Sequence, residues 1–164
     1  MQKKINNTLV RLLLKNELTI AFAESVTCGM AAHQLSTVIG TSSVLKGSIV
    51  CYHESVKKDL FGIPPGILKK HTAESRMVTE LLSKKLKRLV DADIHAAITG
   101  LAAPGGSETK AKPVGTIFFS VLYKRKVYNL RKKLNGTPTR IRKKACNNLY
   151  GFIIDILHAD NLHR

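Results

Sequence analysis

A chain of 164 residues is close to the size of one ordinary domain, so we expect a single domain over residues 1–164 with one core. Hydrophobic residues make up 44% of it, but aromatic residues only 5% and there is no Trp, which argues against an aromatic platform for nucleic-acid bases. The 27 Lys and Arg exceed the 11 Asp and Glu, giving a formal net charge of +16 that indicates an anionic partner.

The sequence carries no sign of a leader peptide or a membrane span. The first apolar run is interrupted by Arg11 and Lys15, and no small-residue cleavage site follows it. No stretch approaches the roughly 20 apolar residues that a membrane helix needs. Cys28, Cys51 and Cys146 are odd in number and lack the spacing of metal ligands. We therefore expect a cytoplasmic protein without a membrane partner, a disulfide framework or a metal site.

The first half of the chain predicts a helix, a strand, a turn into a second helix, and then a second strand. The corresponding segments are 7–16 (amphipathic helix), 18–23 (buried strand), 24–38 (turn and helix), 46–52 (strand) and 55–61 (short helix). Gly62 and the Pro64-Pro65 pair are expected to stop the short helix.

The second half continues the alternation of helices and strands. It predicts a helix over 73–90, a strand over 95–99, a hairpin formed by 116–123 and 126–134, and a final helix over 140–156. Such alternation is typical of an α/β protein. We expect a three-layer α/β/α domain whose sheet is mixed and mostly parallel, because the hairpin adds antiparallel pairing.

The positive charge is concentrated in one part of the chain. Residues 110–144 contain 12 Lys or Arg and no Asp or Glu. This bias can be a solvated basic face, a site for a small phosphorylated ligand, or a surface for a polynucleotide.

The segment AESVTCG, residues 23–29, follows a predicted strand and opens a helix. Ser25 therefore lies where helix N-terminal amides can hold an anion or an oxyanion. The alternative is that Ser25 or Thr27 is only a helix N-cap. A role in chemistry requires partner residues.

The segment YHESVKK, residues 52–58, offers such partners. Tyr52 closes a predicted strand, and Lys57 lies five residues later on the short helix. A lysine is a base for a serine hydroxyl only when burial or nearby positive charge makes its neutral amine accessible, and we expect the basic surroundings to help. The alternatives are a solvated lysine and a tyrosine at the edge of the core.

Two further loops carry glycines and arginines at the ends of predicted strands. The loop over residues 99–116 is long and places Gly100, Gly105 and Gly106 where backbone can approach a ligand closely. It matches neither a P-loop nor a dinucleotide fingerprint. Arg140 and Arg142 stand at the start of the last helix, where they either bind an anion or belong to a basic face.

These loops, in this order and at these separations, resemble the CinA C-terminal-domain family, the nicotinamide-nucleotide amidases. The resemblance runs from about Leu9 to Leu157. It rests on the segments AESVTCG, GTSSVLKGSIVCYHESVKKDLFGIP, LKKHTAES, AAITGLAAPGG and KPVGTIFFSV. Such an ordered set is far more specific than any one of its members.

The resemblance implies an amidase of pyridine-nucleotide recycling that converts nicotinamide mononucleotide to nicotinate mononucleotide and ammonia. It also implies no metal or organic cofactor, a stand-alone form of the domain and a homo-oligomer. The family's nucleophile carries over to Ser25, and its tyrosine and lysine to Tyr52 and Lys57. In the implied mechanism Ser25 attacks the carboxamide, Lys57 takes its proton directly or through Tyr52, and helix N-terminal amides receive the oxyanion. The residues expected to bind the substrate are Thr27, Gly29, Thr99, Gly100, Gly105, Gly106, Arg140 and Arg142.

The chain also departs from the family pattern. Val26 replaces a cysteine, Cys28 and Ala103 each replace a glycine, and Thr137 and Pro138 stand where the family has a charged pair. The segment HTAES stands in place of HGAVS. Two alternatives therefore stay open: a weak or inactive paralogue that binds a nucleotide or another small phosphorylated amide, and, less favoured, a basic accessory protein that binds nucleic acid.

Overall fold

The computed structural model describes residues 2–162. Its elements, in chain order, are α1 (Gln2–Lys15), β1 (Ile20–Glu24), α2 (Met30–Ser36), the 3₁₀ helix η1 (Thr41–Ser43), β2 (Leu45–Val50), α3 (Glu54–Asp59), α4 (Pro65–His71), α5 (Arg76–Leu86), β3 (Ile94–Gly100), β4 (Thr116–Tyr123), β5 (Lys126–Lys133) and α6 (Pro138–Asn161). Within this range no helix combines the length and the apolar composition that crossing a bilayer requires.

The strands form one sheet in the order β2-β1-β3-β4-β5. β1 pairs in parallel with both β2 and β3, whereas β4 is antiparallel to β3 and to β5. All strands except β4 therefore run in the same direction. The prediction of an α/β fold with a mixed, mostly parallel sheet is confirmed.

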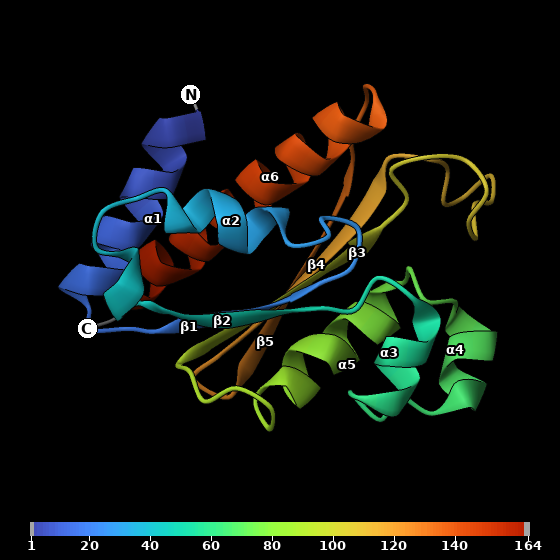
Figure 1. Ribbon diagram of the computed structural model, residues 1–164, viewed down its shortest axis with the longest axis horizontal. Coiled ribbons are helices and arrows are strands. Elements are labelled where there is room, and N and C mark those ends of the chain that lie inside the picture. Colours follow the sequence, from blue (N-terminus) through green and yellow to red (C-terminus); the bar gives the residue numbers. More distant parts are fainter. Residues whose placement is uncertain (1, 163–164) are drawn as a thin grey trace.

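Helices cover both faces of the sheet. α1, α2 and α6 lie on one face, and α3, α4 and α5 lie on the other (Figure 1). Ile20 and Phe22 of β1 pack into the core beneath α1, α2 and α6, and Ala21 and Ala23 pack into the core beneath α3, α4 and α5. Because neither face of β1 meets water, its sequence reads as a continuous apolar run rather than an alternating one.

Several helix boundaries differ from the sequence predictions: α1 begins earlier than residue 7, and α5 is shorter than the predicted 73–90. Proline chemistry explains two of the differences. Pro65 begins a helix, α4, instead of only stopping α3, since the first helical position needs no N–H donor. α6 likewise begins at Pro138, one residue after Thr137, whose hydroxyl accepts from the Arg140 amide at 3.4 Å.

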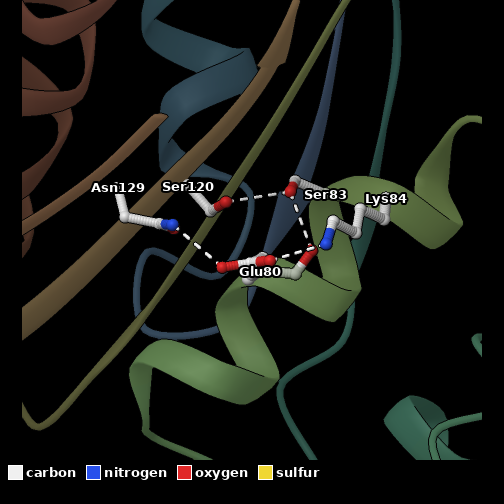
Figure 2. A network of polar contacts seen from close by, with 5 residues as sticks. All are labelled: Glu80, Ser83, Lys84, Ser120 and Asn129. Carbon is white, nitrogen blue, oxygen red and sulfur yellow. Dashed lines mark hydrogen bonds and ion pairs between the residues drawn. The ribbon is translucent and has the colours of Figure 1, made fainter. Parts of the chain in front are cut away.

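A polar network fastens α5 to β4 and β5 (Figure 2). The Ser83 hydroxyl donates to the Glu80 carbonyl oxygen at 2.9 Å, so Ser120 must be the donor in the 2.9 Å bond between the two serine hydroxyls. The Glu80 carboxylate accepts from Lys84 at 2.6 Å and from Asn129 at 2.9 Å. These bonds, that of Lys84 above all, lower the pKa of Glu80. The network fixes α5 against the sheet, and with it the turn that precedes α5 at the candidate site.

Candidate active site

Ser25 lies directly after β1, in the middle of the edge where the parallel strands end. Its amide donates to the Ile98 carbonyl of β3 at 3.0 Å, and the preceding carbonyl, of Glu24, accepts from the Cys51 amide at 2.8 Å. These bonds to both neighbouring strands fix the backbone on either side of the serine. The residue is only 4% exposed and lines a cavity.

The amides at the start of α2 are already occupied, which corrects the expectation that they receive an oxyanion. The fully buried Glu24 carboxylate accepts from the amides of Ala31 and Ala32 at 2.9 Å each. It also accepts from the Ser48 hydroxyl at 2.9 Å. Gly29, not Ser25 or Thr27, takes the N-cap position of α2.

The turn between β1 and α2 offers other donors. Within residues 2–162, the amides of Val26 and Thr27 donate to no acceptor, and the buried Thr27 hydroxyl has no partner. Arg142 Nε donates to the Val26 carbonyl at 2.9 Å and so orients this turn. The Val26 amide, directly after Ser25, is therefore the better candidate to stabilise an oxyanion.

Lys57 is a fully buried lysine on α3. Its Nζ donates to the carbonyl oxygens of Cys51 at 2.7 Å and of Tyr52 at 3.2 Å. Burial lowers the pKa of Lys57, while Cys51, Glu74 and Glu54 act in the opposite direction. The expectation that basic neighbours favour the neutral amine is therefore wrong: the cause is desolvation, and the charged neighbours are acidic.

The cavity beside Ser25 has a volume of about 200 Å³ and gathers several of the predicted residues. It is lined by Ser25, Val26, Tyr52, Glu74, Gly100, Leu101, Ala102, Ala103, Pro104, Gly105, Gly106 and Arg142. Thr27, Gly29, Lys57, Thr99 and Arg140 lie outside this lining. Lys57 reaches Tyr52 only through the Tyr52 carbonyl oxygen, and in the described part of the chain no hydrogen bond joins the side chain of Ser25, Tyr52 or Lys57 to the side chain of another of the three.

Thr99 and Gly100 end β3 and serve different purposes. The fully buried Thr99 hydroxyl lies 2.8 Å from the Thr79 hydroxyl of α5. Because Thr79 donates to the Ser75 carbonyl at 2.6 Å, Thr99 is the donor of this pair and is bonded to α5. At Gly100 a Cβ would lie 2.6 Å from the Thr116 carbonyl oxygen, so only glycine allows β4 to approach this closely.

A cluster that the sequence analysis did not assign to the site holds the 101–115 loop. Lys112 Nζ donates to the Thr72 hydroxyl at 2.6 Å, the Ser107 hydroxyl at 2.7 Å and the Glu74 carbonyl at 3.0 Å. Ser107 in turn donates to the Glu74 carboxylate at 2.5 Å. Lys112 belongs to the segment KPVGT and Glu74 to the segment HTAES, and both segments contribute to the family resemblance. Neither segment by itself shows that Lys112 and Glu74 lie side by side.

The two arginines of α6 differ in position. Arg142 is partly buried, lines the cavity and is bonded to the Ser25 turn. Arg140 is exposed in the first turn of the helix, where its side chain lies against Gly136. The structure thus separates two residues that the sequence analysis treated alike.

Residues 2–157 match the family model of the CinA C-terminal domain. The chain belongs to this family. A CinA-like protein from Thermotoga neapolitana is 36% identical over 143 residues, which is 87% of this chain and 35% of that protein. The chain therefore spans about a third of the length of this relative.

Solved structures confirm the CinA fold. A competence-damaged protein (CinA) superfamily protein from Klebsiella pneumoniae superposes with a TM-score of 0.91 at 23% identity, covering 97% of this chain and 99% of that one. A CinA superfamily protein from Escherichia coli gives a TM-score of 0.89 at 22% identity, covering 95% and 90%. At these identities the likeness shows the fold alone.

Cys28 provides a test of the turn after Ser25. It is exposed, and its φ of 50° is one that glycine adopts without strain. We expect Cys28→Gly to raise the free energy of unfolding by up to about 1 kcal/mol, measured by urea denaturation. Cys28→Ala keeps Cβ and loses the thiol, so it should bring no such gain. Equal stability of the two variants would show that the turn is unstrained.

Proposed function

We propose that the chain is an amidase that hydrolyses nicotinamide mononucleotide to nicotinate mononucleotide and ammonia. The observation that carries the proposal is the buried Lys57, whose Nζ donates to carbonyl oxygens beside a cavity that Ser25 and Tyr52 line. Within residues 2–162 it forms no salt bridge. A buried lysine without a carboxylate partner readily becomes a neutral amine, and a neutral amine is a base for serine.

In the proposed reaction Ser25 Oγ bonds to the carboxamide carbon, and its proton passes to Lys57 directly or through the Tyr52 hydroxyl. The Val26 amide stabilises the oxyanion. The C–N bond then breaks, and the proton on Lys57 passes to the departing ammonia. Water hydrolyses the acyl ester, which releases the acid and restores the serine. The contacts between these side chains are expected to shorten when substrate binds.

The charges in the cavity suit this substrate. Arg142 supplies a guanidinium and Glu74 a carboxylate to the same lining. Nicotinamide mononucleotide carries an anionic phosphate and a cationic ring, so opposite ends of the ligand have complementary partners. Membership in the CinA C-terminal domain family is consistent with this activity.

The first test measures ammonia released from nicotinamide mononucleotide by the purified protein and by Ser25→Ala. We expect release by the wild type and none above background by the variant, because the acyl-enzyme cannot form. The variant should unfold at the wild-type temperature. Substrate binding by the wild type without ammonia release would instead support a nucleotide-binding paralogue.

The second test follows activity against pH. Because the neutral amine is the base, kcat/KM should rise with pH through the pKa of Lys57, with a midpoint below the ordinary value of 10.5. Lys57→Met should abolish this limb along with most of the activity. Lys58→Met is the matched control, since Lys58 is exposed on the same helix, and its profile should be unchanged. An unaltered profile in Lys57→Met would exclude Lys57 as the base.

The third test concerns the phosphate. If Arg142 contacts it, Arg142→Met should weaken nicotinamide mononucleotide by about tenfold or more, the effect of losing a charge-assisted bond. The dephosphorylated riboside should lose less affinity, because it shares only the loss of the Arg142 bond to the Val26 carbonyl. Arg140→Met, which removes an exposed guanidinium outside the cavity, should change neither by more than about twofold. Equal losses for the mononucleotide and the riboside would contradict a phosphate contact.

A further inference from the structure

An anion is already bound at the edge of the cavity, and it is a side chain of the protein itself. The amides of Gly105 and Gly106 donate to the two carboxylate oxygens of Glu108, each at 2.8 Å. Both glycines line the cavity beside Ser25, whereas Glu108 does not. Neighbouring amides that converge on one anion are the arrangement by which protein backbone holds phosphates and carboxylates.

Glycine suits this arrangement at both positions. Gly105 has a φ of 96°, which turns its amide and the next toward the same side. A Cβ on Gly106 would lie 2.7 Å from Leu101 Cδ2. The loop that carries them is held at its base by Lys112 and Ser107, so the amide pair has a defined position beside the cavity.

Glu108 is poorly secured as the occupant of these amides. It is fully exposed and forms no salt bridge with any residue in the described range. The backbone amides, Gly105 first, lower the pKa of Glu108, so it is ionised at neutral pH. Bonds to an exposed carboxylate are readily exchanged for bonds to water or to another anion. Lys112 of the same loop also lowers the pKa of Glu108, and the cations Arg131 and Lys133 of β5 donate to loop carbonyl oxygens, those of Ala111 and Val114. Arg142 and Glu74 share the cavity lining with the two glycines.

We propose that the Gly105 and Gly106 amides are the subsite for the phosphate monoester of the ligand, and that Glu108 is an internal competitor which this phosphate displaces. The proposal rests on the proposed function only for the identity of that ligand. A carboxylate and a phosphate present similar oxygens to two amides, but they cannot occupy the pair together because their charges repel. Glu108 thereby weakens binding of phosphorylated ligands relative to unphosphorylated ones.

The test needs no amidase activity. Inorganic phosphate is titrated into ¹⁵N-labelled protein at constant ionic strength, and the amide resonances of Gly105 and Gly106 are followed by NMR. We expect both resonances to shift, with a dissociation constant roughly two- to fivefold lower in Glu108→Ala than in the wild type, the range that exposed charge contacts produce. Glu108→Gln, which loses the charge but keeps one acceptor, should lie between them.

Asp155→Ala is the matched control for net charge. Asp155 is exposed on α6 and lies outside the cavity lining, so its loss should leave the dissociation constant unchanged. A parallel titration with nicotinamide mononucleotide and its riboside separates a nucleotide phosphate from the free ion: only the mononucleotide should gain affinity in Glu108→Ala.

Either of two results overturns the proposal. One is that phosphate fails to shift the Gly105 and Gly106 resonances in Glu108→Ala, and the other is that it binds this variant no more tightly than the wild type. The second result would make Glu108 a support of the loop rather than a competitor. Tighter phosphate binding by Glu108→Ala together with no ammonia release by the wild type would uphold this subsite and refute the amidase proposal, so the two failures are distinguishable.

Discussion

The buried carboxylate of Glu24 is the interaction on which the rest of the site depends. It is the last residue of β1, and it accepts from two α2 amides and from Ser48 of β2. One side chain thus joins a central strand, its neighbour and the following helix. A carboxylate with no exposure is stable only when hydrogen bonds replace its water, and here the helix terminus supplies them. Ser25 follows directly, so the position of the candidate nucleophile is set by this bond pattern.

Lys112 has a comparable role for the loop that brings Gly105 and Gly106 to the cavity. Its three donors join Thr72, Glu74 and Ser107, which brings the 101–115 loop against the turn between α4 and α5. The loop is long and has little regular structure, so side-chain bonds rather than backbone ladders keep it in place. Arg131 and Lys133 of β5 also donate to loop carbonyl oxygens, so one wall of the cavity is fixed by strand pairing and the other mainly by side-chain bonds. The carboxylate held by the loop, that of Glu108, is exposed, whereas Glu24 beside the Ser25 turn is fully buried, so only Glu108 can readily exchange with another anion.

Burial, rather than the large positive charge of the chain, governs the protonation of Lys57. The basic residues over 126–144 carry no salt bridge in the described range and mostly face solvent, where counter-ions screen them within about 10 Å. Lys57 lies under the β2–α3 connection with two carbonyl oxygens as acceptors, and acids are its charged neighbours. Desolvation acts locally and is not screened, so it exceeds the opposing charges.

The sequence by itself determined the alternation of helices and strands, the hairpin over β4 and β5, and the placement of Ser25, Tyr52 and Gly100 near strand ends. These features follow from local patterns: apolar periodicity, turn residues and glycine. Only the tertiary structure decided that Thr99 is bonded to Thr79, that Glu24 rather than a ligand occupies the α2 amides, and that Arg142 but not Arg140 lines the cavity. Each of these contacts depends on how one packed element is rotated relative to its neighbour. Hydrophobic periodicity shows which face of an element is buried, but not its rotation closely enough to place a single side chain. The loop contacts of Lys112 with Thr72 span 40 residues and arise only when α5 is packed on β4, which no local pattern encodes.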